Sequence, residues 1–80
     1  MRAKIKITLK PGVLDPQGKA LAHSLGNLGF EGVREVRQGK YIEIDLAETD
    51  RDRAQELVEQ MCGSLLANPL IETYKVELDA

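Results

Sequence analysis

Residue types that commonly carry chemistry are scarce in this 80-residue chain, and they lie far apart. His23 is the only histidine and falls on the outward face of a predicted helix, where a solvated side chain is the simplest interpretation. Cys62 is the only cysteine, and its apolar neighbourhood without a histidine favours a buried, inert thiol. A nucleophile, a base and an orienting group are not brought together, so we predict no catalytic residue in this chain.

Neither a cofactor site nor a metal site is indicated. Gly26, Gly29 and Gly32 are spaced by three, but they precede a predicted strand, whereas a phosphate-binding loop precedes a helix. The acidic residues around the second predicted helix alternate with Arg51 and Arg53, as they do on a solvated helix face. We therefore predict that this chain has no metal ligands and binds no cofactor itself.

Length and composition describe one small globular domain over residues 1–80. The formal net charge of -2 argues against a nucleic-acid partner, which normally meets a basic face. No apolar run is long enough for a membrane helix, and a single cysteine fits a reducing compartment, so we expect a cytoplasmic protein that contacts no membrane. A core this small leaves little stability, and oligomerisation would add to it.

A strand followed by a tightly specified turn opens the chain. Residues 4–10 alternate strictly between apolar and polar side chains, which predicts a half-buried strand. Pro11 and Gly12 stop that strand and allow a tight change of direction. Asp15 is then predicted to cap a helix whose first residue is Pro16, where the missing N–H costs nothing.

The helix that follows has one apolar face, which a glycine interrupts. Spacings of three and four predict a buried stripe made of Leu14, Leu21, Leu25 and Leu28. Gly18 lies on that stripe, where no turn requires it and where glycine costs a helix about 1 kcal/mol relative to alanine. We therefore expect either a close approach to this surface or a contact between its backbone and a partner.

Two more strands, a second helix and a final strand are predicted downstream. Residues 31–38 indicate a strand in which the odd separation of Val33 and Val36 implies either a bulge or a late start. Residues 38–40 indicate a tight hairpin turn, and residues 41–46 an alternating strand. The second helix carries an apolar stripe made of Ala54, Leu57, Val58, Met61 and Leu65. From residue 70 onward, apolar and polar residues alternate again in a last strand.

The predicted order is therefore βαββαβ, an α+β two-layer sandwich of the ferredoxin-like type. Its sheet is antiparallel, and both helices are expected to cover the same apolar face. If the strand at residues 4–10 lies beside the strand at residues 41–46, Lys4 and Lys6 come close to Glu43 and Asp45 on the open face.

Several segments together resemble the PurS family, the small subunit of bacterial and archaeal phosphoribosylformylglycinamidine synthase. The resemblance runs over essentially the whole chain, in the same order and at the same length. It is carried by LKPGVLDPQG at residues 9–18, by Val36-Arg37, Gly39-Lys40 and Met61-Cys62, by LLANP at residues 65–69 and by Ile71-Glu72.

The resemblance implies a part in de novo purine biosynthesis, within an ATP-dependent amidoligase. That enzyme converts formylglycinamide ribonucleotide and glutamine into formylglycinamidine ribonucleotide and glutamate, and it hydrolyses ATP to ADP and phosphate. In the family, ATP and Mg²⁺ bind the large synthetase subunit, and a separate glutaminase subunit releases ammonia. The small subunit is a homodimeric structural component that joins the other two and contributes no catalytic residue, and a tetramer of this chain is the alternative to the dimer.

The residues predicted to contact partner subunits lie in these shared segments. They are Lys10, Gln17, Gly18, Arg37 and Lys40. One alternative is an ACT-type domain that senses an amino acid, because such domains share the βαββαβ order and carry Pro-Gly near the first strand-to-helix turn. An RNA-binding domain of the same fold class needs exposed aromatic residues on central strands, and only Tyr41 is a candidate.

Overall fold

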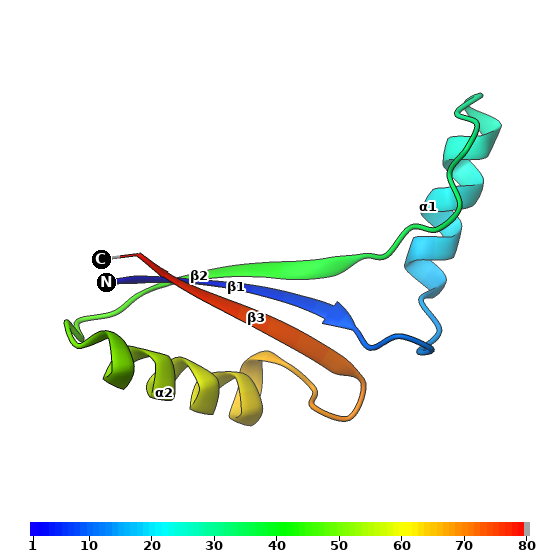
Figure 1. Ribbon diagram of the computed structural model, residues 1–80. Coiled ribbons are helices and arrows are strands. Elements are labelled where there is room, and N and C mark those ends of the chain that lie inside the picture. The colour runs from blue at the N-terminus through cyan, green and yellow to red at the C-terminus, as the bar shows by residue number, and fades with distance from the viewer. Residues whose placement is uncertain (80) are drawn as a thin grey trace.

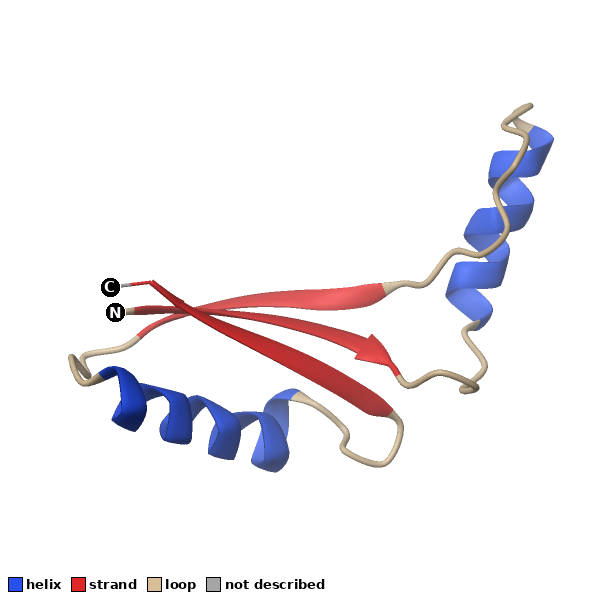
Figure 2. Ribbon diagram, in the orientation of Figure 1, coloured by secondary structure: helices blue, strands red, loops and turns tan. Residues whose placement is uncertain are grey.

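The computed structural model describes residues 1–79, which form an antiparallel sheet and two helices (Figures 1 and 2). The elements are β1 (Arg2–Leu9), α1 (Pro16–Asn27), β2 (Gly39–Asp45), α2 (Arg51–Met61), the π-helical turn η1 (Cys62–Leu66) and β3 (Glu72–Asp79). None of the helices in this described part of the chain has the length and hydropathy needed to cross a membrane.

The sheet has the strand order β2-β1-β3, with β1 in the centre and antiparallel to both neighbours. Ile5 lies opposite Ile42 on β2 and opposite Val76 on β3, so the alternating pattern gathers apolar side chains on one face. The α+β class and the antiparallel sheet are confirmed. Lys4 lies opposite Glu43, as the sequence predicted for the open face.

The core lies between this apolar face and α2. Ala54 and Val58 on α2 and Cys62 at the start of η1 follow one another at intervals of four, and all three are fully buried against the sheet together with Ile5 and Ile7. The buried, unreactive interpretation of Cys62 is consistent with this position, because burial raises the pKa of the thiol. Within one chain, α2 thus provides the packing layer for the β1 and β3 side of the sheet.

The prediction that both helices cover the sheet is wrong for α1. Figure 1 shows α1 projecting away from the sheet, with the following segment running back along it. The protein therefore measures 48 × 25 × 15 Å, and its radius of gyration is 15.9 Å. A compact domain of this length would have a radius of gyration of about 12 Å.

The predicted strand within residues 31–38 and the hairpin turn after it are also wrong. No strand forms between α1 and β2, so the observed order is βαβαβ and the sheet has three strands. Gly39 belongs to β2, where a Cβ atom would overlap the carbonyl oxygen of Ile7 on β1. This glycine permits a close approach of two strands, and the sequence alone did not distinguish that role from a turn.

Candidate functional site

Asp15 joins the projecting part of the molecule to the sheet. We call α1 and the returning residues 28–38 the arm. One carboxylate oxygen of Asp15 accepts a hydrogen bond from the Gly18 N–H at 2.8 Å, which caps α1 as the sequence predicted. The other oxygen accepts from the Gln38 N–H, also at 2.8 Å, at the point where the arm returns to the sheet. A single carboxylate thus holds both ends of the arm.

Both hydrogen bonds favour the ionised form of Asp15. Only 8% of this residue is exposed, yet the N–H groups of Gln38 and then Gly18 hold the pKa of its carboxyl below the ordinary value. A carboxylate with a lowered pKa stabilises the folded arm at pH values above the ordinary pKa of the group. That stabilisation is lost as the pH falls through the lowered pKa.

Acid is therefore expected to release the arm at Asp15. In a two-dimensional NMR titration, the amide protons of Gly18 and Gln38 should shift together, with one midpoint below about 3.9. Asp15→Asn should abolish this shared transition and lower the melting temperature at neutral pH by roughly 5 °C, the effect of losing one helix cap in a domain of this size. Separate midpoints for the two amides would contradict a shared carboxylate.

Gly18 is explained by the return of the chain along α1. The residue is buried, and a Cβ atom on it would overlap the carbonyl oxygen of Val36 and press on the Asp15 carboxyl group. The expectation that something closely approaches Gly18 is confirmed, and the approaching group is backbone of the same chain.

Arg37 ties the end of the arm to the end of β1, and we call this place the junction. Its Nη2 donates to the carbonyl oxygens of Leu9 and Lys10 at 2.8 and 3.0 Å, and its Nη1 lies 3.3 Å from Glu35. The Lys10 N–H in turn donates to the Ile71 carbonyl oxygen at 2.7 Å. The end of β1, the arm and the start of β3 are therefore tied together at one place.

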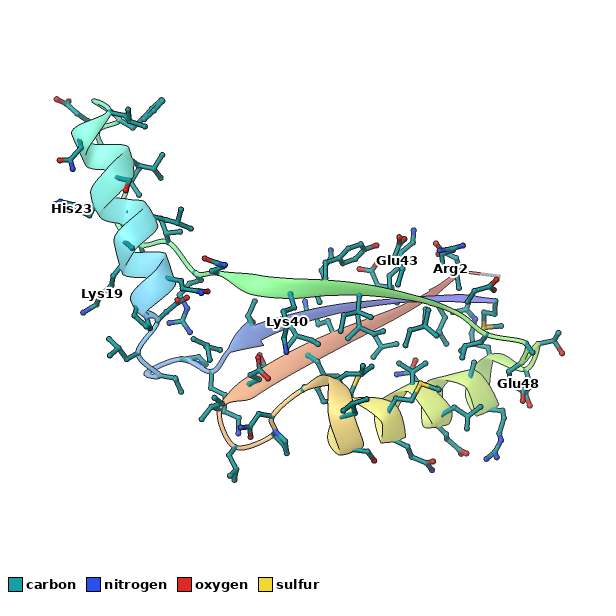
Figure 3. All side chains as sticks on the ribbon, turned by 180° about the vertical axis from the view of Figure 1, so that it is seen from behind. Arg2, Lys19, His23, Lys40, Glu43 and Glu48 are labelled. Carbon is teal, nitrogen blue, oxygen red and sulfur yellow. The ribbon has the colours of Figure 1, made fainter. Side chains whose placement is uncertain are left out.

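The five predicted contact residues fall into two groups. Lys10, Gly18 and Arg37 meet at this junction, while Gln17 is exposed on the first turn of α1. Lys40 is separate: it points from β2 toward η1, and its Nζ lies 3.3 Å from the Leu66 carbonyl oxygen and 3.7 Å from Glu72 (Figure 3). The structure therefore gives Gly18, Arg37 and Lys40 roles within the chain.

The arm presents a large apolar surface that the sequence analysis assigned to the core. Leucines at intervals of three and four were expected to face the sheet, but Leu21 is 45% and Leu28 is 74% exposed. The returning segment adds two more exposed apolar residues, Phe30 and Val33. Exposed apolar residues gathered on one projecting segment are typical of a surface that contacts another polypeptide.

The groups that could catalyse a reaction stay dispersed. His23 is exposed on the side of α1 that faces away from the sheet, as predicted (Figure 3). Among residues 1–79 there is no cluster of three or more histidine, cysteine or carboxylate side chains that could hold a metal ion.

On the open face of the sheet, Lys4 pairs with Asp79 at 2.7 Å, and this bond lowers the pKa of the Asp79 carboxyl.

Fold and surface together define a small α+β protein with a projecting apolar arm, a class suited to binding other polypeptides. The sequence profile of the PurS family, described as phosphoribosylformylglycinamidine (FGAM) synthase, matches residues 2–80. The chain belongs to this family, and it is a PurS-type subunit of FGAM synthase, a ligase of purine biosynthesis.

Relatives from distant organisms support this assignment. The chain is 47% identical to the PurS subunit of Synechocystis sp., over 96% of this chain and 77% of that one. It is 44% identical to the PurS subunit of Bacillus subtilis, over 98% of this chain and 92% of that one. A crystal structure of B. subtilis PurS superimposes with a TM-score of 0.89 at 43% identity, covering 99% of this chain and 98% of that one.

A chain in the structure of PurLQS from Thermotoga maritima is also similar. It has a TM-score of 0.87 at 30% identity, and the match covers 95% of this chain and 93% of that one. These matches give no support to an ACT-type sensor. An RNA-binding role is not supported either, because the central strand β1 carries no aromatic residue and Tyr41 lies on the edge strand β2.

Proposed function

We propose that this chain is a noncatalytic, homodimeric adaptor of the FGAM synthase complex. It holds the glutaminase subunit against the large synthetase subunit, so that ammonia released from glutamine reaches the second active site. The overall reaction consumes formylglycinamide ribonucleotide, glutamine, ATP and water, and it yields formylglycinamidine ribonucleotide, glutamate, ADP and phosphate. ATP and Mg²⁺ belong to the synthetase subunit, and the complex works in the cytoplasm.

The exposed apolar arm is the observation that carries this proposal. An adaptor contributes by position: it keeps two active sites together and closes the path between them, which raises the effective concentration of ammonia at the second site. Such a role requires surfaces for other polypeptides and no activated nucleophile. Membership of the PurS family and the likeness to a chain of the T. maritima PurLQS structure supply the identity of the partners.

The way in which the arm and the sheet complement each other supports the homodimer. In one protomer, α2 packs toward β3, and Ile42 and Ile44 on the β2 side of the apolar face are only half-buried. The arm of the same protomer points away from that position (Figure 1). We infer that two protomers exchange arms, so that each arm covers apolar surface on its partner under twofold symmetry.

Partner contacts for Lys10, Gln17, Gly18, Arg37 and Lys40 remain part of the proposal. Exposed Gln17 is suited to touch a partner directly. Gly18 and Arg37 act through the direction of the arm, since both hold its base against the rest of the chain.

Reconstitution of the synthase with and without this chain tests the adaptor role. Omitting the chain is expected to reduce glutamine-dependent product formation at least about 100-fold, within the range attributed to positioning of reactants. Activity with added ammonium salt should persist, because it bypasses transfer between subunits. The chain alone should consume neither glutamine nor ATP, and turnover of either by the purified chain would overturn the proposal.

A further inference from the structure

The open face of the sheet separates its charges by sign. Arg2 and Lys4 on β1 each lie between two carboxylates of the neighbouring strands. The flanking carboxylates are Asp45 and Asp79 for Arg2, and Glu43 and Glu77 for Lys4. Lys6, the next residue of β1 on this face, lies between Tyr41 and Lys75 instead. Carboxylates therefore gather at the start of β1, and two lysines stand directly opposite each other nearer the junction.

The two lysines border an open groove together with two threonines. The groove has a volume of about 400 Å³ and is lined by Lys6, Thr8, Thr73, Tyr74 and Lys75. Thr8 lies opposite Thr73, and their hydroxyl oxygens are 3.5 Å apart, so that either hydroxyl can donate. Within residues 1–79, no carboxylate lines the groove. We call it the lysine groove, because two ammonium groups lie beside two hydroxyl groups there.

The positive charge of the lysine groove is only weakly compensated. Like charges directly opposite each other destabilise a pair of strands. Lys75 forms no ion pair among residues 1–79, and the Lys6 Nζ lies 3.8 Å from a carboxylate oxygen of Glu77. The two side chains of that pair are 62% and 60% exposed, and an ion pair so exposed contributes little. An anion between the two lysines would relieve a repulsion that the folded chain leaves in place.

We propose that the lysine groove binds a phosphate group, either as inorganic phosphate or as the phosphate monoester of a small metabolite. A phosphate monoester at neutral pH carries about 1.5 to 2 negative charges and three acceptor oxygens. It can therefore accept hydrogen bonds from both ammonium groups and from a threonine hydroxyl. A carboxylate carries one charge and two oxygens, so it would leave one lysine uncompensated. This site goes beyond the adaptor function and does not depend on it.

The carboxylates of a second copy are less suited to the lysine groove. On the same open face, the Asp79 carboxylate already lies 2.7 Å from the Lys4 Nζ of its own chain. Glu43 accepts a hydrogen bond from the Tyr41 hydroxyl at 3.4 Å. Docking of a second open face would exchange these contacts for new ones, whereas a free phosphate adds contacts without removing these.

Lys75→Gln tests the site, and Lys19→Gln is its matched control. Both lysines are exposed, but Lys19 lies on α1 and points away from the sheet (Figure 3). The isotope-labelled full chain is titrated with inorganic phosphate and with glycerol phosphate at about pH 8, where the phosphate is a dianion. The NMR signals of the Lys6, Thr8 and Thr73 amides should shift with a dissociation constant of about 1 mM. Lys75→Gln should raise this constant about 10-fold, and Lys19→Gln should change it less than about 2-fold at constant ionic strength.

A second variant, a second anion and the oligomer mass complete the experiment. Lys6→Gln should weaken binding as Lys75→Gln does, and all variants should keep the wild-type circular dichroism spectrum and mass in solution. Stronger binding of glycerol phosphate would identify a monoester as the ligand, and equal or weaker binding would identify phosphate itself.

Three results would overturn the proposal: no saturable shift, equal shifts with acetate, or wild-type binding by both groove variants. A lower oligomer mass of Lys75→Gln would overturn it as well, because a second copy would then occupy the groove.

Discussion

Replacing Gly18 with alanine is expected to lower the free energy of unfolding by roughly 2–3 kcal/mol, the cost of overpacking a site whose neighbours cannot move away. The new methyl group would overlap the Val36 carbonyl oxygen and would lie 2.9 Å from the carboxyl carbon of Asp15. Backbone at Val36 cannot give way without breaking the Gln38 hydrogen bond that follows it. The melting temperature should fall by about 10 °C or more.

Gly26→Ala provides a control within the same helix. A Cβ atom at Gly26 meets nothing within 4 Å, so alanine there should stabilise α1 by up to about 1 kcal/mol. Thermal melts of the two variants, followed by circular dichroism, should therefore move in opposite directions. Equal stability of Gly18→Ala and Gly26→Ala would mean that the return of the chain along α1 is not a fixed contact.

The double change Leu21→Ser and Leu28→Ser is expected to convert the homodimer to monomers. Burying one leucine contributes about 1.5–3 kcal/mol, and twofold symmetry doubles the number of leucines lost. The dimer dissociation constant should rise at least about 1000-fold, which sedimentation equilibrium can measure. Because both leucines are already exposed in the single chain, its fold and helical content should be unchanged.

Leu70→Ser serves as the comparison, because it removes an exposed leucine outside the arm. It should leave the dissociation constant of the dimer unaltered. If the double variant in the arm sediments as the wild type does, the arms are not the dimer contact. Loss of the dimer in both variants would indicate a general loss of solubility or fold.

The limits of sequence analysis are clearest around α1. Asp15 as the cap, Pro16 as the first residue and the need for a close approach at Gly18 were all predicted correctly, because caps and helical glycines depend on local geometry. Where the apolar face of α1 points could not be predicted, since a leucine stripe is the same whether its cover comes from the same chain or from another.

The segment after α1 likewise shows that local patterns could not predict structure that depends on distant residues. Two valines suggested a strand there, but the backbone of this segment is held by the carboxylate of Asp15 and the bare Cα of Gly18, both distant in sequence. Leu65 was predicted to belong to the apolar stripe of the second helix, but it lies in the π-helical turn η1 and is 83% exposed. A single π-turn leaves no mark in an apolar pattern of α-helical spacing.

The amino-acid sequence by itself determined the α+β class, the antiparallel strands β1, β2 and β3, the start of α1, the buried Cys62 and, through the shared segments, the family. These features depend on periods of two and four residues and on local caps, which short stretches of sequence specify. Only the tertiary structure decided that the sheet has three strands, that α1 projects as an arm and that Leu65 faces outward. Each of these depends on hydrogen bonds and close approaches between distant or non-periodic positions, and no local pattern encodes them.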